Sequence, residues 1–251
     1  MRFGICMDVN LIEEVQRLGF DYLEAKLNAL ALLSEEEFEK ISKLVVKSSI
    51  AVERCCLLFP KSMVVIGPEY DEAAMVAYLH TAFARMRILG ASLVVFGSGK
   101  SRFIPQGMSY QKAFQELVAV TKIVGQIASE YGIKVAIEPL NRNETNLINS
   151  LVEGAALQSM VGLDNVGLLA DAFHMRTEGE DMHTISLVSP LMHAHIATKE
   201  GRRFPLCVDQ ELLEFISALK QSGYDLSVSI EGKSDDWQND AVRSLAALKS
   251  L

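Results

Sequence analysis

The stretch YQKAFQELVAVTKIVGQIASEYGIKVAIE, residues 110–138, contains the unit that decides the fold. In its first part, apolar or small side chains recur every three or four residues, at Phe114, Leu117, Thr121, Val124, Ala128 and Tyr131. This spacing places them on one face of an amphipathic helix over 110–131. Gly132 marks the end of that helix, and the apolar run 134–138 predicts a buried strand directly after it.

The same alternation of helix and strand recurs along the whole chain. We expect eight short apolar strands, at residues 2–6, 21–27, 51–59, 92–97, 134–138, 166–171, 191–197 and 226–231. Strands separated by helices pair in parallel through right-handed crossovers. Eight units in 251 residues give about 31 residues per unit, which fits a single-domain (β/α)8 TIM barrel over 1–251. An open doubly wound sheet would carry a Gly-rich phosphate turn after its first strand, and residues 7–10 contain no glycine.

Local signals mark where helices begin and end. Two capping boxes are expected, each a Ser followed three residues later by a Glu: Ser34–Glu37 and Ser150–Glu153. Asn10 with Glu13 fits the same pattern more loosely. Helices are expected to end at glycines that stand just before a strand: Gly19, Gly90, Gly132 and Gly223.

Composition narrows the class of protein. The net charge of -8 and the lack of a long Lys/Arg run argue against nucleic acid as a partner. The start MRFGICMDVN lacks the pattern of a signal peptide, and no run of about 18 apolar residues exists, so we expect a cytoplasmic protein without a membrane span. The four cysteines show no CxxC spacing and are expected to be reduced, mostly buried thiols: Cys6, Cys55, Cys56 and Cys207.

Four consecutive predicted strands each end in a side chain that can bind a metal. Glu138, Asp171, His195 and Glu231 are separated by 33, 24 and 36 residues, about one strand–helix unit each. The carboxyl ends of barrel strands converge on one small volume, so we expect these side chains to meet there. Three carboxylates would repel one another without a cation between them, and a divalent metal ion resolves that repulsion.

Each of these residues also has an ordinary interpretation when taken alone. Glu138 could form an ion pair with Arg142, Asp171 could cap the next helix, and Glu231 could be solvated in a loop. A single histidine such as His195 is more often packed in a core than bound to a metal. His193, two residues earlier on the same strand face, is expected to be a packed barrel histidine or a partner of a ligand.

The motifs that follow the fourth strand resemble a known family. EPLNR (138–142) with Glu144 and Asn146, DAFHM (171–175), HAHIA (193–197) and SIEG (229–232) resemble the xylose isomerase-like TIM barrels. They are most similar to the branch of ketose 3-epimerases, hydroxypyruvate isomerases and sugar phosphate isomerases/epimerases. The layout resembles this family over most of the chain, and the specific motifs occupy the second half, from FGSG (96–99) onward.

This resemblance implies a role for each motif residue. It implies one divalent metal ion, Mn²⁺, Mg²⁺, Co²⁺ or Zn²⁺, with four ligands: Glu138, Asp171, His195 and Glu231. Glu138 and Glu231 would also be the catalytic acid/base pair. His174 and Glu144 would contact the substrate, as would an arginine that falls on Arg202 or Arg203.

The loop after His195 departs from the family pattern. Ketose epimerases carry HxxExxR here, whereas this chain reads HIATKEGRR, with Thr198 in the place of the acid. The identity of the substrate therefore stays open at this point. FGSGKSR (96–102) could cradle a hydroxyl or phosphate group through backbone N–H groups, although a tight turn is the simpler interpretation.

The resemblance implies a metal-dependent isomerase or epimerase of a small ketose or ketose phosphate, acting through an enediolate. One alternative on the same site is a lyase that dehydrates a sugar or an inositol-derived ketone. A second is an endonuclease IV-like hydrolase, which would need several zinc ions and many histidines, and this chain has five. A third is a non-catalytic sugar-binding barrel. The resemblance also leaves a homo-oligomer open, since members of the family often pair through their outer helices.

Overall fold

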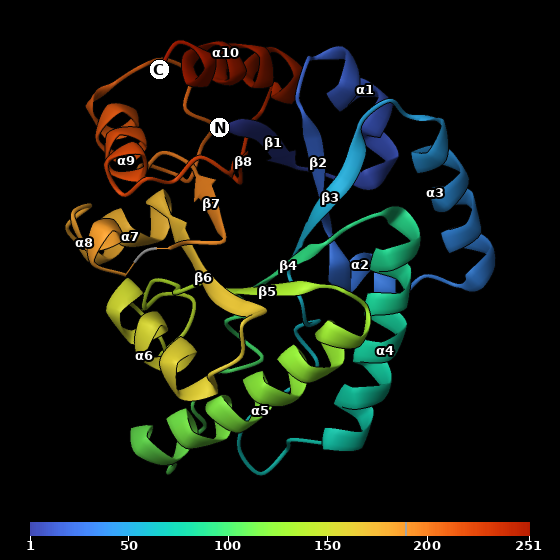
Figure 1. Ribbon diagram of the computed structural model, residues 1–251, viewed down its shortest axis with the longest axis vertical. Coiled ribbons are helices and arrows are strands. Elements are labelled where there is room, and N and C mark those ends of the chain that lie inside the picture. Colours follow the sequence, from blue (N-terminus) through green and yellow to red (C-terminus); the bar gives the residue numbers. More distant parts are fainter. Residues whose placement is uncertain (189) are drawn as a thin grey trace.

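The computed structural model describes residues 1–188 and 190–251. Within this part, eight parallel strands form a closed barrel in which each strand pairs with the next and β8 pairs with β1 (Figure 1). The strands are β1 (Arg2–Cys6), β2 (Tyr22–Lys26), β3 (Ala51–Cys56), β4 (Leu93–Phe96), β5 (Lys134–Ile137), β6 (Val166–Asp171), β7 (His193–Ile196) and β8 (Ser227–Ile230). The predicted single (β/α)8 barrel is confirmed.

Helices surround the barrel on its outside (Figure 1). They are α1 (Ile12–Arg17), α2 (Leu27–Ala31), α3 (Glu35–Lys47), α4 (Glu72–Leu89), α5 (Tyr110–Glu130), α6 (Leu151–Val161), α7 (Ala172–Glu178), α8 (Thr184–Val188), α9 (Gln210–Gln221) and α10 (Trp237–Lys249), with a 3₁₀ helix, η1, at Val9–Leu11. The helix predicted over 110–131 is confirmed as α5. No helix in the described ranges is long and apolar enough to cross a membrane.

Several strand ranges were predicted too long, for a local reason. The strand predicted over 51–59 ends at Cys56, because Leu57 takes the left-handed conformation with φ 56° and turns the chain out of the sheet. The glycine stops are correct: Gly19, Gly90, Gly132 and Gly223 all have φ between 69° and 86°.

Of the two predicted capping boxes, one is complete and the other is formed only in part. Ser34 and Glu37 form the complete capping box of α3. At α6 only half of the box exists, because Ser150 Oγ accepts from the Glu153 N–H while the Glu153 carboxylate accepts from Asn149 N instead.

The prediction of a helix start at Asn10 and Glu13 is wrong. Asp8 Oδ1 accepts from the backbone N–H of Asn10 at 2.9 Å and starts η1 earlier. α1 then follows without a side-chain cap. Asp8 is thus the N-cap of η1, and Asn10 lies inside that 3₁₀ helix instead of capping α1.

The interior of the barrel contains an apolar cluster of strand residues: Cys56, Leu93, Val95, Ala136 and Leu169. The larger core lies between strands and helices, where α5 contributes Leu117 and Val124. Because the strands are parallel, their carboxyl ends open at one mouth. Parts of the irregular segments after β3 and β4 lie at this mouth, and their residues Lys61 and Ser98 line a cavity there.

Candidate active site

The four side chains predicted as metal ligands lie together at the barrel mouth. Asp171 ends β6 and His195 lies in β7, while Glu138 and Glu231 directly follow β5 and β8. Each offers one donor atom, and these atoms all lie within 4.8 Å of one another. Glu138, Asp171 and His195 are buried and Glu231 is half-buried. Four consecutive strands thus bring three carboxylates and an imidazole to one point.

The contacts within this group fit a divalent cation. His195 Nδ1 lies 3.3 Å from Glu138 Oε1 and 3.1 Å from Glu231 Oε2. Asp171 Oδ1 accepts from the Phe173 N–H at 2.7 Å, so Asp171 does cap the following helix. Its other oxygen, Oδ2, is buried and makes no hydrogen bond within the described residues. Arg202 Nη2 lies 3.6 Å from this oxygen, in an ion pair too long for a hydrogen bond, so the oxygen keeps a free acceptor position. Carboxylate with imidazole suits Mn²⁺, Mg²⁺, Co²⁺ or Zn²⁺ at such a position.

A fully buried glutamate from β2, which the sequence analysis did not single out, orients the histidine. Glu24 Oε1 lies 3.0 Å from His195 Nε2, and Glu24 Oε2 lies 2.8 Å from His193 Nε2. With a metal ion on Nδ1, the bond to Glu24 would hold the remaining proton of His195 on Nε2. His193 is fully buried, as expected of a packed histidine that supports a ligand. The sequence feature that could have drawn attention to Glu24 is the position of a charged residue in the middle of the strand YLEAK (22–26).

The two glutamates of the group differ in proton affinity. Burial raises the pKa of Glu138, and the nearby Glu231 carboxylate raises it further against the effect of His195. Burial alone would raise the pKa of Glu231 as well, but His195 and Arg202 outweigh it and lower the pKa to about 2. Burial likewise opposes the charge of His195, yet Glu24 and Glu231 hold its pKa well above the usual range. The different surroundings of Glu138 and Glu231 thus give their two carboxyl groups different pKa values.

Arg202 closes the group on its solvent side. Its Nη2 donates to Glu231 Oε2 at 2.7 Å, and its Nη1 donates to Glu144 Oε1 at 3.2 Å. The guanidinium carbon lies 4.8 Å from the centre of the Phe173 ring, in a cation–π contact. Burial would lower the pKa of Arg202, but Glu231 and Asp171 outweigh it and raise the pKa.

Arg203 points elsewhere. Its Nη2 pairs with Asp235 at 2.6 Å, and both side chains are well exposed. Thr198 Oγ1 accepts from the Arg203 backbone N–H at 3.1 Å and so helps to close the loop after β7. Of the two arginines between which the sequence could not decide, the structure therefore brings only Arg202 to the carboxylate group.

His174 presents a free N–H to the same space. The Asn141 backbone N–H donates to His174 Nδ1 at 3.0 Å, so this nitrogen accepts and the proton lies on Nε2. Nε2 is buried, has no hydrogen-bond partner in the described part of the chain, and lies 3.7 Å from Asp171 Oδ2. A donor and an acceptor without partners thus face the same space.

The surroundings of Glu138 exclude its simple interpretation as a partner of Arg142, which pairs with Glu178 instead. Arg102, a fully buried arginine that sequence reasoning missed, donates to the Glu138 backbone carbonyl at 2.7 Å. Gly97 lies against the other side of Glu138, and a Cβ atom at Gly97 would overlap the Glu138 carboxylate. Arg102 therefore holds the backbone of Glu138, and the absence of a side chain at Gly97 leaves the space that the carboxylate occupies.

A cavity of about 270 Å³ opens beside the group. Its lining includes three carboxylates and three cations: Glu138, Glu144, Glu231, Lys61, Lys100 and Arg202. The turn after β4 forms one wall, where Ser98 Oγ accepts from the Phe59 N–H at 3.0 Å. The Ser98 side chain therefore ties this segment to the loop after β3. The Ser101 N–H donates to the Ser98 carbonyl at 2.9 Å, so the segment forms a tight turn, as the simpler interpretation expected, and this turn borders the cavity.

Comparison with known proteins agrees with this geometry. A family model described as the xylose isomerase-like TIM barrel matches residues 12–251. D-psicose 3-epimerase of Agrobacterium fabrum is 29% identical over 205 residues, which cover 76% of this chain and 67% of that protein. Inosose isomerase of Halalkalibacterium halodurans is 29% identical over 126 residues, 45% of this chain and 44% of that protein. The second match thus spans less than half of the relative.

Solved structures share the whole fold. A D-psicose 3-epimerase crystallised in the presence of D-fructose superposes with a TM-score of 0.85 at 23% identity, covering 99% of both chains. The IOLI protein with a bound zinc atom superposes with a TM-score of 0.77 at 19% identity, covering 99% of this chain and 96% of that one. At these identities the structures establish the fold.

Proposed function

This chain belongs to the xylose isomerase-like TIM barrel family, and we propose that it is a divalent-metal-dependent isomerase or epimerase of a small ketose or ketose phosphate. The observation that carries the proposal is the group of Glu138, Asp171, His195 and Glu231, with donor atoms within 4.8 Å of one another beside a cavity of about 270 Å³. That volume suits a ligand smaller than a drug molecule. Relatives named as epimerases and isomerases of sugars support the reaction class.

We propose that these four side chains hold one divalent metal ion. Asp171 Oδ2, buried and without a hydrogen bond among the described residues, supports a cation at this point. The zinc atom bound to a structural neighbour supports the charge class and leaves the identity of the ion open. A bound divalent ion would polarise the carbonyl and adjacent hydroxyl of a ketose and stabilise the negative charge of an enediolate.

Glu138 and Glu231 are proposed to move the protons. They follow β5 and β8, which are separated by two strands in the barrel, so they reach the cavity from different sides. One carboxylate takes the proton from the carbon beside the carbonyl, and the other carboxyl returns a proton to a carbon. Return to the opposite face of the same carbon gives an epimer, and return to the neighbouring carbon gives an isomer. Such transfers contribute about 10²- to 10⁴-fold in rate.

Three further side chains are proposed to bind the sugar. His174 offers an Nε2–H without a partner in the described part of the chain. Glu144 lines the cavity and can accept a hydroxyl hydrogen bond. Arg202 is the arginine proposed to contact substrate, because Arg203 is paired with Asp235. Lys61 and Lys100 also line the cavity and would suit a phosphate group on the substrate.

The test is proton exchange with solvent. The metal-loaded protein is incubated with a panel of ketoses and ketose phosphates in deuterated water, and incorporation is followed by NMR. We expect deuterium at the carbon beside the carbonyl of at least one sugar, and about a hundredfold or greater loss in Glu138→Gln and Glu231→Gln. Arg203→Gln is the matched surface control. Sugar binding without exchange would favour a non-catalytic barrel, and release of water from an inositol-derived ketone would favour the dehydratase.

One structural observation weighs against the endonuclease IV-like alternative. That reaction would need several zinc ions held by many histidines. Among the described residues, no candidate group of metal ligands contains more than one histidine. The carboxylate-rich group at this mouth therefore supports a single hard or borderline ion more than a zinc cluster.

A further inference from the structure

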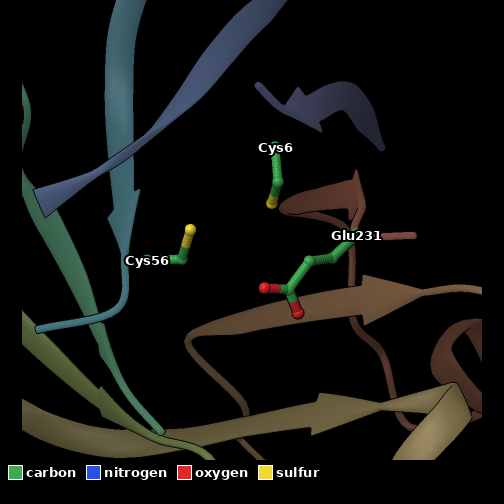
Figure 2. A group of neighbouring side chains, drawn as sticks. All are labelled: Cys6, Cys56 and Glu231. Atoms are coloured by element: carbon green, nitrogen blue, oxygen red, sulfur yellow. The ribbon is translucent and has the colours of Figure 1, made fainter. Parts of the chain in front are cut away.

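Two thiols lie directly beside the proposed metal site. Cys6 is the last residue of β1 and Cys56 is the last residue of β3. Figure 2 shows the two sulfur atoms and the Glu231 carboxylate around one common space, with the Cys6 sulfur turned toward that carboxylate. The two sulfur atoms and a Glu231 oxygen all lie within 4.8 Å of one another. Cys56 is buried, whereas Cys6 and Glu231 are half-buried.

The spacing of the two thiols suits binding of both to one metal ion and does not suit a disulfide bond. β2 lies between β1 and β3, so the two Cα atoms are about two strand spacings apart, roughly 9–10 Å. Disulfides need Cα atoms within about 7 Å. Two thiolates on one tetrahedral zinc ion have sulfur atoms about 3.8 Å apart, given Zn–S bonds of about 2.3 Å. Only small side-chain movements separate Cys6 and Cys56 from that arrangement.

We propose that Cys6, Cys56 and Glu231 form a second metal site, which takes a thiophilic divalent cation such as Zn²⁺ or Cd²⁺. Thiolates select soft and borderline ions over Mn²⁺ and Mg²⁺. Cys6 also lies within 4.8 Å of donor atoms of Glu24 and His195, but both Glu24 oxygens are bonded to histidines, so the fourth position is left to solvent.

The shared carboxylate makes the two sites exclusive. Glu231 belongs both to the thiol group and to the carboxylate–histidine group. An ion held by the thiols draws Glu231 away from the first site and places a second positive charge beside it. A thiophilic ion therefore inhibits by removing a ligand and a proton-transfer group together. This exclusivity rests on the proposed function, whereas binding to the thiols does not.

Cadmium titration of the metal-free, full-length protein tests the thiol site. Formation of thiolate–Cd²⁺ bonds is followed by their charge-transfer absorption in the ultraviolet. We expect one equivalent of Cd²⁺ per chain, and about a hundredfold or greater loss of affinity in Cys6→Ser and in Cys56→Ser. The alanine substitutions at both positions repeat the test without a buried hydroxyl, and circular dichroism reports folding.

The other two cysteines are matched controls. Cys207 is exposed, and Cys55 is buried but outside the group. Cys207→Ser and Cys55→Ser should keep the full band and affinity. An unchanged band in Cys6→Ser and Cys56→Ser, or a band lost in Cys207→Ser, would overturn the proposal.

Competition with Mn²⁺ tests the shared ligand. Protein loaded with Mn²⁺ receives one equivalent of Cd²⁺, and the electron paramagnetic resonance signal of free Mn²⁺ is recorded. We expect release of Mn²⁺ in the unmodified chain and far less release in the Cys6→Ser/Cys56→Ser double variant. Retention of Mn²⁺ together with a full thiolate band would refute exclusivity. A chain that binds no Mn²⁺ would count against the proposed function, and the thiolate band would still decide the thiol site.

Discussion

Replacement of Glu24 by glutamine is the sharpest probe of how the site is held. The carboxylate uses both oxygens, one 3.0 Å from His195 Nε2 and one 2.8 Å from His193 Nε2, and all three side chains are fully buried. An amide has the same shape but only one acceptor oxygen, so it brings an N–H group against one of the two histidines. The substitution also removes the negative charge that would make His195 a more basic ligand of the proposed metal ion.

The size of the effect follows from these contacts. Loss of the group that orients a metal-ligating histidine typically costs about 10- to 100-fold in metal affinity, or about 1.4–2.7 kcal/mol. One charge-assisted hydrogen bond is also lost from the folded chain, which costs about 1.5–3 kcal/mol. We therefore expect Glu24→Gln to fold, to bind Mn²⁺ about 10- to 100-fold more weakly, and to be measurably less stable.

Isothermal titration with Mn²⁺ and urea unfolding of the metal-free chain measure the two effects separately. Glu39→Gln is the control, because Glu39 forms an exposed ion pair with Lys43 on α3 at 2.8 Å and such pairs contribute about 0–1 kcal/mol. A Glu24→Gln variant that loses stability but keeps the original Mn²⁺ affinity would show that Glu24 only supports the fold. The reasoning about His195 would then be refuted.

Three other substitutions have expected outcomes. Gly97→Ala should displace the Glu138 carboxylate, which the new Cβ would overlap, and so lower turnover about a hundredfold with little change in urea unfolding; unchanged turnover would contradict this. Arg202→Lys should raise KM about tenfold because it loses the fork between two carboxylates, whereas Arg203→Lys should stay within about twofold; equal effects in steady-state kinetics would contradict the assignment. Burial raises the pKa of Glu180 from 4.5 to about 7, so the folded chain binds a proton more tightly than the unfolded chain, and stability falls as pH rises through that window. Glu180→Gln should therefore add about 1 kcal/mol at pH 8 after solvent screening, and nothing at about pH 4, in urea unfolding; an equal gain at both pH values would contradict this.

Most of the fold could be predicted because it depends on local patterns. Buried parallel strands are short apolar runs, and the glycine stops act within a single turn. The strand ends were harder, because they depend on single dihedral angles such as that of Leu57. The start predicted at Asn10 was wrong because Asp8 caps a 3₁₀ helix that includes Asn10, and α1 follows this helix directly.

The candidate ligands could be predicted from their spacing, because each barrel unit returns the chain to the same mouth. Glu24 could not, since a charged residue in a strand is usually exposed and its partners lie 169 and 171 positions away. The proximity of Cys6 and Cys56 could not be predicted from the sequence either, because it depends on the curvature that brings the ends of β1 and β3 together across β2. Arg202 could be separated from Arg203 only by the loop, where Arg202 has φ 50°.

The two halves of the barrel supply different groups to the mouth. The four ligands of the first proposed site come from the ends of β5 to β8, while Glu24, Cys6 and Cys56 come from β1 to β3. The first half of the chain thus supplies both thiols of the second proposed site and the carboxylate that orients His195. A mutant library confined to the first half would change these groups while all four ligands of the first proposed site stay in place.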